Sequence, residues 1–506
     1  MLKIMQNLTS KISLLLVGAI LVVVNLIGVN WFGRLDLTDD QVFTLAPSSV
    51  SLVQKLKDPV TVKVYFTDNL PAPYSANRRL LRDKLNEYRA YGGQKFQYQF
   101  HSPDNEKDKK VANEAGVPPV QVQVMENDAL QIKNAYMGLT ISYGGKKEVL
   151  PVIQDLSNLE YDLSTAIRKL SSENLPKIGF LTGHGEPNPD DVMRFWKQGL
   201  DKSYTTLQVQ VDSTGQLSEK PDVLMVVAPT SPLPEAAINA LDDFIMQGGK
   251  VGFFLNRINA SIQTGVANPF ESGLENLFEK YGIGLQPNLV QDRQSAPISA
   301  QNGPFTMQIP YTFLPIVTKF NAHPVTEGVR EMLLPFVSTI DLGKKGKGIQ
   351  ATPLLFSSAN SSVQKNVFNI QPDPNATSNP VLTGGPYVLA AAYEGRFLSA
   401  VIAGKIGKPT RLLAVGDGDF MNEGIVGQPP DGSLIFAMNT IDWLLQDQTL
   451  ASIRSKQLAP RPLNQVSDGA KGAIKWFAIL VPALLVAGFG LFRWRMRKNI
   501  RYDSTP

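Results

Sequence analysis

A histidine and a glutamate two residues apart are the side chains of this sequence best placed for chemistry. They are His184 and Glu186, and they follow an apolar run in KIGFLTGHGEPN, residues 177–188. An imidazole and a carboxylate at this spacing can act as an acid–base pair or ligate a metal ion. A hydrolase would also need a nucleophile or further ligands, and the sequence contains neither a GxSxG elbow nor an HExxH motif.

The glycines around the histidine favour a second interpretation. Gly183 and Gly185 permit a tight turn between a strand and a helix, with Asn188 or Asp190 as the helix cap. Because ligands of parallel α/β sheets bind at the carboxyl ends of the strands, such a turn can also bind a ligand. Catalysis, binding and a structural turn therefore stay open for this segment. We assign it as a candidate binding loop and name no catalytic residue.

Two aspartates form the second candidate. Asp417 and Asp419 lie in VGDGDFMNEG, residues 415–424, where another apolar strand ends. Paired carboxylates can hold Mg²⁺ or Ca²⁺. Aspartates at such a corner also commonly accept hydrogen bonds from the backbone amides of the turn. We assign both aspartates to a candidate binding loop and predict no metal ion and no cofactor.

The composition excludes several other chemistries. The chain has 506 residues, no cysteine and three histidines, so disulfides, thiolate metal sites, a cysteine nucleophile and a histidine-rich cluster are excluded. The phosphate-binding pattern GxxxxGK[ST] is absent from the sequence. A formal net charge of +4, spread along the chain, gives no reason to expect nucleic acid as a partner.

An apolar segment lies near each end of the chain. Residues 12–33 carry no charge and end close to Trp31 and Phe32, aromatic residues typical of a membrane interface. Residues 473–492 form the second segment, in which Lys475 can extend to the interface. We expect each segment to cross a bilayer as one helix.

Basic residues predict the orientation of both segments. Lys3 and Lys11 precede the first segment, and the C-terminal tail 493–506 carries five Lys or Arg side chains. The positive-inside rule therefore places both short tails, 1–11 and 493–506, in the cytoplasm. We expect a two-pass protein with about 440 residues on the far side of the membrane.

Two α/β domains are expected between the apolar segments. Residues 34–156 show the order strand–helix–strand–helix–strand–strand, which predicts a small thioredoxin-like domain, and a linking helix follows at 157–175. Residues 176–450 alternate apolar strands with amphipathic helices and predict a doubly wound parallel sheet. Within them, 343–385 is rich in Gly, Asn, Ser and Pro and predicts an insertion with loops and an edge hairpin. Residues 451–472 have the composition of a stalk.

Three motifs occur in a distinctive order along the chain. They are LTDDQVFTLAPSSVSLVQKLKDPVTVKVYF after the first apolar segment, then IGFLTGHGEPN, then RLLAVGDGDFMNEG with NTIDWLL. Together they resemble the GldG-like family, auxiliary subunits of ABC transporters, over nearly the whole chain. The resemblance implies that the second domain is similar to class I glutamine amidotransferase domains and to intraflagellar-transport subunit domains. An amidotransferase uses a cysteine nucleophile, so this cysteine-free chain cannot keep that reaction.

The resemblance also implies a function. We expect a non-catalytic subunit of an ABC transporter in the inner membrane of a bacterium, with its main body in the periplasm. The implied partners are a multi-span permease and a cytoplasmic ATPase, and a cell-envelope component is a further expected partner. The gliding role that names the family, and the transported substrate, do not carry over. The alternative is a membrane-anchored periplasmic hydrolase or sugar-binding protein that uses the His184/Glu186 corner.

Overall fold

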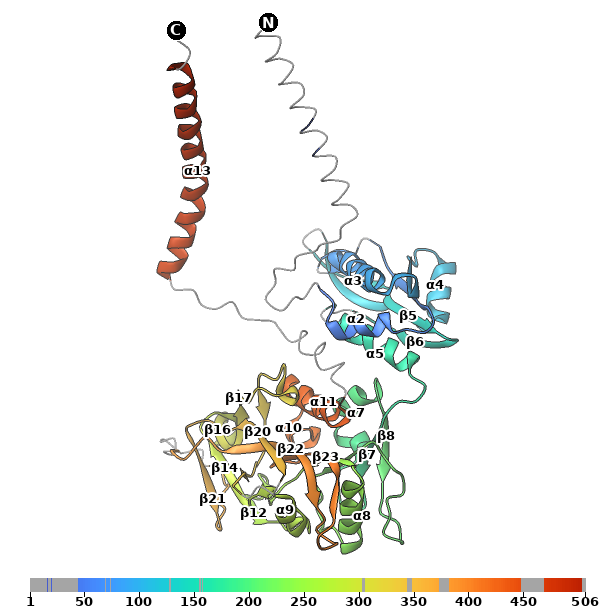
Figure 1. Cartoon of the computed structure of the whole chain (residues 1–506), viewed down its shortest axis with the longest axis vertical. Coiled ribbons are helices and arrows are strands. Elements are labelled where there is room, and N and C mark those ends of the chain that lie inside the picture. Colours follow the sequence, from blue (N-terminus) through green and yellow to red (C-terminus); the bar gives the residue numbers. More distant parts are fainter. Residues whose placement is uncertain are drawn as a thin grey trace. The chain divides into compact units, whose positions relative to one another are not determined.

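The computed structural model consists of two units, Met1–Leu458 and Ala459–Pro506, which are described separately (Figure 1). The residues that it describes are Leu16, Ile20, 44–68, 70–72, 74–126, 129–153, 156, 158–302, 305–343, 348–372, 382–446 and 468–502.

The first half of the larger unit is a small α/β domain. Its helices are α2 (Pro47–Gln54), α3 (Asn77–Gly92), α4 (Glu106–Glu114) and α5 (Leu159–Ser171). Its strands are β1 (Val60–Phe66), β2 (Phe96–His101), β3 (Val120–Glu126), β4 (Ala129–Ala135), β5 (Met137–Tyr143) and β6 (Lys146–Leu150). The sheet has the order β2-β1-β5-β6, with β1 parallel to β2 and antiparallel to β5. The predicted alternation of strands and helices is confirmed, and the thioredoxin-like assignment stays a prediction.

Helix α3 shows how the sequence builds the core of this domain. Leu81, Leu85 and Tyr88 recur at helical spacing and are fully buried, whereas Arg82 between them is exposed. The aromatic ring of Tyr88 stacks on Phe96 at the start of β2, with ring centroids 5.3 Å apart. One apolar stripe therefore fixes α3 against the sheet.

Helix α5, which falls within the predicted linking segment, is part of the same core. Leu163 and Ile167 are buried against the sheet. The buried Glu160 accepts hydrogen bonds from the backbone N–H of Ala46 at 2.6 Å and from the Ser49 hydroxyl at 2.8 Å. A buried carboxylate needs such donors, so α5 and the start of α2 hold each other in place.

The second domain is built on an eight-stranded sheet of order β17-β20-β22-β23-β10-β9-β7-β8. These strands are β7 (Lys177–Leu181), β8 (Thr205–Val209), β9 (Val223–Val227), β10 (Lys250–Phe254), β17 (Lys319–Phe320), β20 (Ile349–Phe356), β22 (Val388–Leu398) and β23 (Ile406–Val415). The helices are α6 (Pro189–Val192), α7 (Arg194–Asp201), α8 (Glu235–Met246), α9 (Glu275–Tyr281), α10 (Glu423–Val426) and α11 (Asp431–Leu445).

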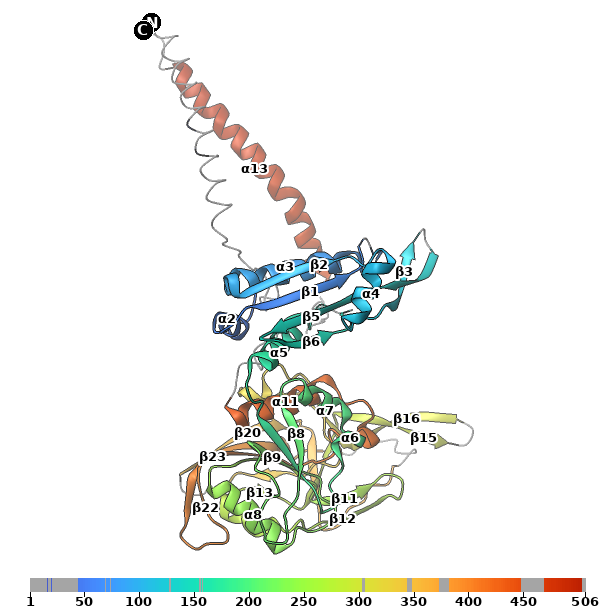
Figure 2. The ribbon, with the colours of Figure 1, turned by 90° about the vertical axis from the view of Figure 1, so that its right-hand side faces the viewer.

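Smaller sheets surround this one. Their strands are β11 (Ile258–Ser261), β12 (Val266–Pro269), β13 (Gly284–Leu285), β14 (Asn288–Asp292), β15 (Ser295–Asn302), β16 (Phe305–Val317), β18 (Met332–Leu333), β19 (Ile340–Asp341) and β21 (Ser361–Lys365). Strands β15 and β16 pair as a long antiparallel hairpin that projects from the body (Figure 2).

The predicted parallel sheet is confirmed for five strands and wrong for three. Strands β8, β7, β9, β10 and β23 run parallel, whereas β22, β20 and β17 are each antiparallel to their neighbours. The reason is visible in the connection between β22 and β23, residues 399–405. A parallel crossover needs a dozen or more residues, so this short connection forces a hairpin.

The predicted edge hairpin inside 343–385 is also wrong. Strand β20 lies within the main sheet between β17 and β22, and β21 pairs with β14 in a separate ribbon. The two strands are consecutive in the sequence, but each finds its partner elsewhere. Within this segment, 344–347 and 373–381 lie outside the described residues.

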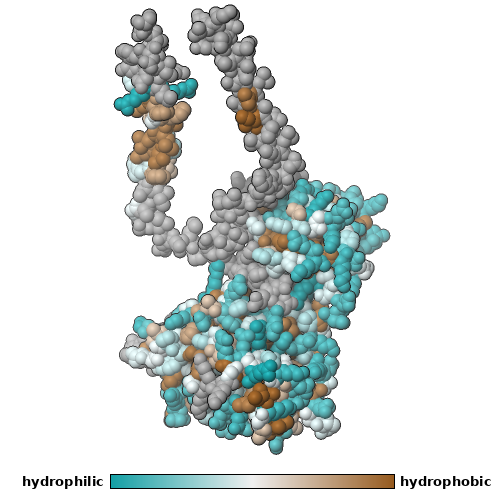
Figure 3. Space-filling model, viewed as in Figure 1, coloured by the Kyte–Doolittle hydropathy of each residue, from teal (hydrophilic) through white to brown (hydrophobic). Residues whose placement is uncertain are grey.

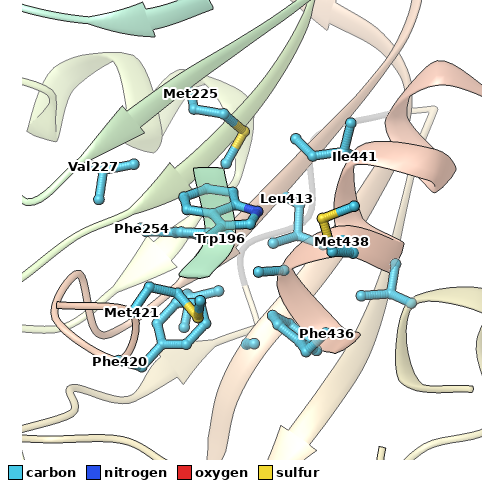
Figure 4. Close-up of a cluster of buried hydrophobic side chains, with 14 of the residues drawn as sticks. Trp196, Met225, Val227, Phe254, Leu413, Phe420, Met421, Phe436, Met438 and Ile441 are labelled. Carbon is cyan, nitrogen blue, oxygen red and sulfur yellow. The ribbon is translucent and has the colours of Figure 1, made fainter. Parts of the chain in front are cut away.

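Helices cover both faces of the main sheet, α7 and α11 on one and α8 and α9 on the other (Figure 1). On the first face, the fully buried Trp196 stacks on Phe254 at a ring-centroid distance of 5.7 Å (Figure 4). Trp196 also meets Phe180 edge-on at a ring-centroid distance of 5.2 Å. The sequence of β9, VLMVV, is buried at every position because both faces of a central parallel strand are covered.

The smaller unit contains α13 (Asp468–Tyr502), which begins within the predicted stalk. Its segment Lys475–Arg495 is long and apolar enough to cross a membrane, and none of it is buried against protein (Figure 3). The predicted C-terminal span is thus matched by a helix of suitable length and composition. The predicted first span, 12–33, lies outside the described residues apart from Leu16 and Ile20.

Candidate functional site

Both candidate loops lie at the carboxyl edge of the parallel strands. The His184 loop follows β7 and the Asp417 loop follows β23, and the strand order places β9 and β10 between them. After β7 the chain adds β8 on one side of that strand and then returns to add β9 on its other side, so the order of the strands reverses at β7. Ligands of open α/β sheets bind at such a switch point.

A cavity of about 430 Å³ brings the two loops together. Its lining consists of backbone, amide, hydroxyl and small apolar groups with one carboxylate, and it includes no Lys, Arg or His side chain among the described residues. The lining residues are Gly185, Pro187, Ala228, Pro229, Thr230, Asn256, Asn259, Ala260, Ser261, Thr264, Val266, Asp419, Asn422 and Ile425. Of the predicted residues, Gly185 and Asp419 line the cavity, whereas Gly183, His184, Glu186 and Asp417 do not.

In the first corner the imidazole and the carboxylate hold each other. The Nδ1 atom of His184 lies 3.0 Å from Oε1 of Glu186, and the backbone N–H of His184 donates to Oε2 at 2.7 Å. The Glu186 side chain is only 2% exposed and that of His184 11%. Both carboxylate oxygens are thus engaged within the loop itself.

The loop after β9 completes this corner. The carbonyl oxygen of His184 accepts hydrogen bonds from the backbone N–H groups of Thr230 at 3.1 Å and Ser231 at 2.9 Å. The Thr230 hydroxyl donates to the carbonyl of Gly185 at 3.2 Å. Gly185 has a φ of 78°, and a Cβ there would lie 2.0 Å from the Thr230 hydroxyl oxygen. Glycine is therefore required by both conformation and space.

The short helix that follows is capped as one of the two predicted alternatives requires. The side-chain oxygen of Asn188 accepts a hydrogen bond from the backbone N–H of Asp190 at 3.1 Å. This cap begins α6 directly after the loop. The first corner therefore has the construction of a tight strand-to-helix turn.

The second corner contains a carboxyl group with an unpartnered oxygen. Asp417 is fully buried, and its Oδ1 accepts the backbone N–H of Asp419 at 2.7 Å. Its Oδ2 is buried without a hydrogen-bond partner among the described residues. Burial raises the pKa of the Asp417 carboxyl well above its usual range, and the neighbouring charge of Asp419 raises it further.

Asp419 faces the cavity and is tied to β10 through an asparagine. The Asn256 amide donates to Oδ2 of Asp419 at 2.7 Å, and its oxygen accepts the backbone N–H of Gly418 at 2.9 Å. Burial raises the pKa of Asp419, and the hydrogen bonds from Asn256 and Asn422 oppose this shift. One side chain from the segment after β10 thus orients both the carboxylate and the backbone of the second corner.

A metal centre is not assembled here. Among the residues that the structure describes, no group of three or more His, Asp or Glu side chains is placed to hold a metal ion. Asp417 accepts a backbone N–H of the turn with one oxygen, as the second of the two interpretations requires, and Asp419 accepts the side-chain amide of Asn256.

Sequence reasoning missed the residues that join the loops. Thr230 and Asn256 lie in the segments after the apolar strands β9 and β10, and the β11–β12 hairpin supplies Asn259, Ser261 and Val266 to the cavity. A usable signal was present, since polar residues at the ends of neighbouring parallel strands meet at one edge.

Comparison with known proteins now identifies the family. Residues 175–439, which contain the main sheet and the cavity, match the family model of an auxiliary ABC transport protein, described as an ABC-type uncharacterized transport system. The chain belongs to this ABC transporter auxiliary family. Residues 39–142 match a second model, a domain family of unknown function. The predicted ABC transporter auxiliary family is confirmed, and the narrower GldG-like assignment stays a prediction.

One of the proteins similar to this chain matches it along most of its length. An uncharacterized protein of Borreliella burgdorferi is 23% identical over 485 residues, which cover 92% of this chain and 94% of that protein. The mmIFT52 N-terminal domain is 14% identical with a TM-score of 0.34, covering 53% of this chain and 96% of its own. A ThuA-like protein from Parabacteroides merdae is 12% identical with a TM-score of 0.27, covering 54% and 90%. With TM-scores this low, the two structures carry no argument about fold or function.

Membership in this family indicates the general role of the chain. An auxiliary component has an accessory, non-catalytic role in ABC transport and associates with transporter components such as a permease and an ATPase. Together with the apolar helix α13, it indicates that this protein is associated with a membrane.

Proposed function

We propose that this chain is a two-pass, non-catalytic subunit of a GldG-like ABC transporter in a bacterial inner membrane. Both termini lie in the cytoplasm, and the two α/β domains lie in the periplasm, where they bind an extracytoplasmic partner or substrate. The first domain belongs to the thioredoxin-like class, a proposal supported by the strand order β2-β1-β5-β6, and the second to the amidotransferase-like class.

The observation that carries the proposal is the pairing of the family match with α13. The match at 175–439 covers the domain that contains the cavity, and α13 presents apolar side chains such as Leu484 (66% exposed) and Phe489 (64% exposed). Such a surface needs lipid or another membrane protein around it. Arg493 and Arg495 at one end of the apolar segment support a cytoplasmic C-terminus.

Small residues on α13 support a helix–helix contact with a permease. A Cβ at Gly488 or at Gly490 would meet no heavy atom within 4 Å. Glycines in a membrane helix allow a neighbouring backbone to approach closely. Because Gly488 and Gly490 lie about 200° apart around the helix, we place the contact with the permease on the side that carries Gly488.

The geometry of the first corner supports a structural role for Glu186. Its side chain is only 2% exposed, and both of its oxygens accept hydrogen bonds from His184, so the carboxylate is turned into the loop rather than toward a ligand. The cavity instead offers Asn, Thr and Ser side chains with the single carboxylate of Asp419. Those groups suit the recognition of an uncharged polar group or a hydrogen-bond donor.

Purification of the full chain from its own membranes in mild detergent tests the assignment. We expect an ABC ATPase and a multi-span permease to copurify in fixed proportion, as identified by mass spectrometry. Gly488→Ile should reduce their recovery severalfold, and Val486→Ile, on a different side of the helix, should leave it unchanged. Recovery of the wild-type chain without either partner would refute the proposal.

Orientation has its own test, because the chain has no native cysteine. A single cysteine at Thr214, in an exposed turn, should react with a membrane-impermeant maleimide added to intact spheroplasts. A cysteine at Ser504, in the C-terminal tail, should react only after the membrane is opened. Protection of position 214 would place the body in the cytoplasm instead.

The His184–Glu186 contact at the sheet edge leaves one alternative function to be tested. In a periplasmic hydrolase or sugar-binding protein that uses this corner, His184→Ala would abolish function while the complex still assembled. We expect His184→Ala to act through the stability of the loop, so a lowered Tm should accompany any loss of function.

A further inference from the structure

The turn between β22 and β23 exposes an unusual number of apolar side chains. Leu398, Val401, Ile402 and Ile406 are 43%, 46%, 51% and 61% exposed, respectively, within one short segment. We call residues 398–408 the hairpin tip. Apolar side chains gathered in this way mark a contact surface more often than a solvent-facing turn.

Hydrogen bonds hold the hairpin tip in shape. The Ser399 hydroxyl donates to Oδ2 of Asp242 at 2.6 Å, and the backbone N–H of Ala400 donates to Oδ1 at 2.7 Å. The Ser399 hydroxyl oxygen also accepts the backbone N–H of Ile402 at 2.7 Å. Because Asp242 lies in α8 and is only 2% exposed, the tip is anchored to the body beside that helix (Figure 2).

This anchoring presents Val401 and Ile402 outward in a defined turn. A turn with no role in contact would be expected to carry polar residues at these positions. The sequence SAVIAGKIGK, residues 399–408, contains none of the Asn or Asp residues typical of hairpin turns.

Basic side chains flank the apolar ones. Arg396 and Lys408 are exposed on either side of the turn, and Lys405 lies within it. Lys405 Nζ is 3.6 Å from a carboxylate oxygen of Asp243. This exposed ion pair contributes little to stability, so Lys405 can exchange Asp243 for another anionic partner. Long basic side chains beside exposed apolar ones are typical of protein surfaces that rest in the headgroup region of a membrane.

The position of the hairpin tip in the fold suits such a contact. It precedes β23, so it lies at the edge of the sheet opposite the cavity. The last turn of α11 lies beside the middle of β23, where Arg411 donates to the carbonyl of Trp443 at 2.8 Å. From the end of α11 the sequence continues through residues 447–467 into α13.

We propose that the hairpin tip docks on the lipid surface of the membrane that α13 crosses. Val401, Ile402 and Ile406 would enter the boundary between headgroups and acyl chains, and Lys408 and Arg396 would contact anionic headgroups. The cavity, at the opposite edge of the sheet, would then face away from the bilayer toward its partner. This inference rests on the membrane insertion of α13 that the proposed function assumes.

Quenching of a single fluorophore tests the docking in the full chain. The absence of native cysteine allows Val401→Cys to be labelled with an environment-sensitive probe in nanodiscs that contain lipids with spin labels at the headgroup–acyl boundary. Ile425→Cys is the matched control, because Ile425 is 48% exposed, apolar and located at the cavity edge. Phe477→Cys in α13 reports insertion of the helix independently.

We expect strong quenching at position 477, and quenching at position 401 that is about threefold greater than at position 425. Replacing neutral lipid by anionic lipid should increase quenching at 401, and Lys408→Glu should remove that increase. Equal, weak quenching at 401 and 425 with strong quenching at 477 would overturn the docking proposal alone. Weak quenching at all three positions would overturn the membrane anchor as well.

Discussion

The two corners of the cavity edge use carboxyl groups in opposite ways. In the first, both oxygens of Glu186 accept hydrogen bonds from one residue, His184, and the carboxylate stabilises a turn. In the second, Asp417 is fully buried with one oxygen unpartnered among the described residues, while Asp419 faces the cavity. A carboxylate at a strand end is therefore not evidence of chemistry by itself. The donors around it decide whether it builds the loop or remains available.

Adding a side chain at a glycine of one of the two corners should give the largest effect on stability. A Cβ at Gly416 would lie 2.0 Å from the carbonyl oxygen of Ser338, a backbone atom that cannot rotate away. We expect Gly416→Ala to lower the free energy of unfolding by about 3 kcal/mol. Gly183→Ala meets open space and adds only strain at a φ of 118°, so we expect a loss of about 1 kcal/mol. Equal losses in urea unfolding of the two variants would contradict this reading.

Removing the asparagine that orders the second corner comes next. Asn256→Ala deletes the hydrogen bonds to Asp419 and to the backbone of Gly418. We expect a loss of about 2 kcal/mol, because a buried carboxyl group loses its amide donor. The control is Asn259→Ala, which removes an exposed amide from the same cavity and should change stability by less than about 0.5 kcal/mol.

Replacing the carboxylate of the first corner by an amide should have a smaller effect on stability. Glu186→Gln keeps one acceptor oxygen and replaces the other by an NH2 group, which cannot accept a hydrogen bond from His184. We expect a loss of about 1 kcal/mol. Glu279→Gln, an exposed change of the same kind, should be silent in the same thermal unfolding assay. A silent Glu186→Gln would show that the hydrogen bonds of this corner contribute nothing to stability.

Asp417→Asn should stabilise the folded protein, unlike the variants above, and its effect should depend on pH. Because burial raises the pKa of Asp417 in the folded protein, the folded state binds more protons than the unfolded state above about pH 4. Stability of the wild type is therefore lost as the pH rises toward the folded pKa. The neutral asparagine removes this loss, and we expect the variant to be about 1 kcal/mol more stable at pH 7.

The measurement is the difference in Tm between Asp417→Asn and wild type from pH 4 to pH 8. We expect the difference to grow in favour of the variant as the pH rises through this range. A difference that stays constant with pH would mean that Asp417 does not titrate differently in the two states.

Much of this edge could be predicted from local sequence, and the rest could not. Apolar runs that end in glycines located both corners, and the helix cap was predicted as Asn188 or Asp190, of which the structure uses Asn188. The contacts that join the corners link residues far apart in sequence, such as Asn256 with Asp419, 163 positions apart, so no local pattern signals them. The three antiparallel strands of the sheet were missed because neither the buried β22 nor the partly exposed β20 shows clear alternation, and their direction depends on connection length.

The central claim is that the chain functions as the membrane-anchored, non-catalytic partner of an ABC transporter. Native mass spectrometry of the complex released from membranes tests it most directly. The account predicts one assembly whose mass accounts for this chain together with a permease and an ATPase, and whose ATPase subunits dissociate before this chain loses the permease. An intact, monodisperse chain without either partner, extracted from cells that express all three, would contradict it.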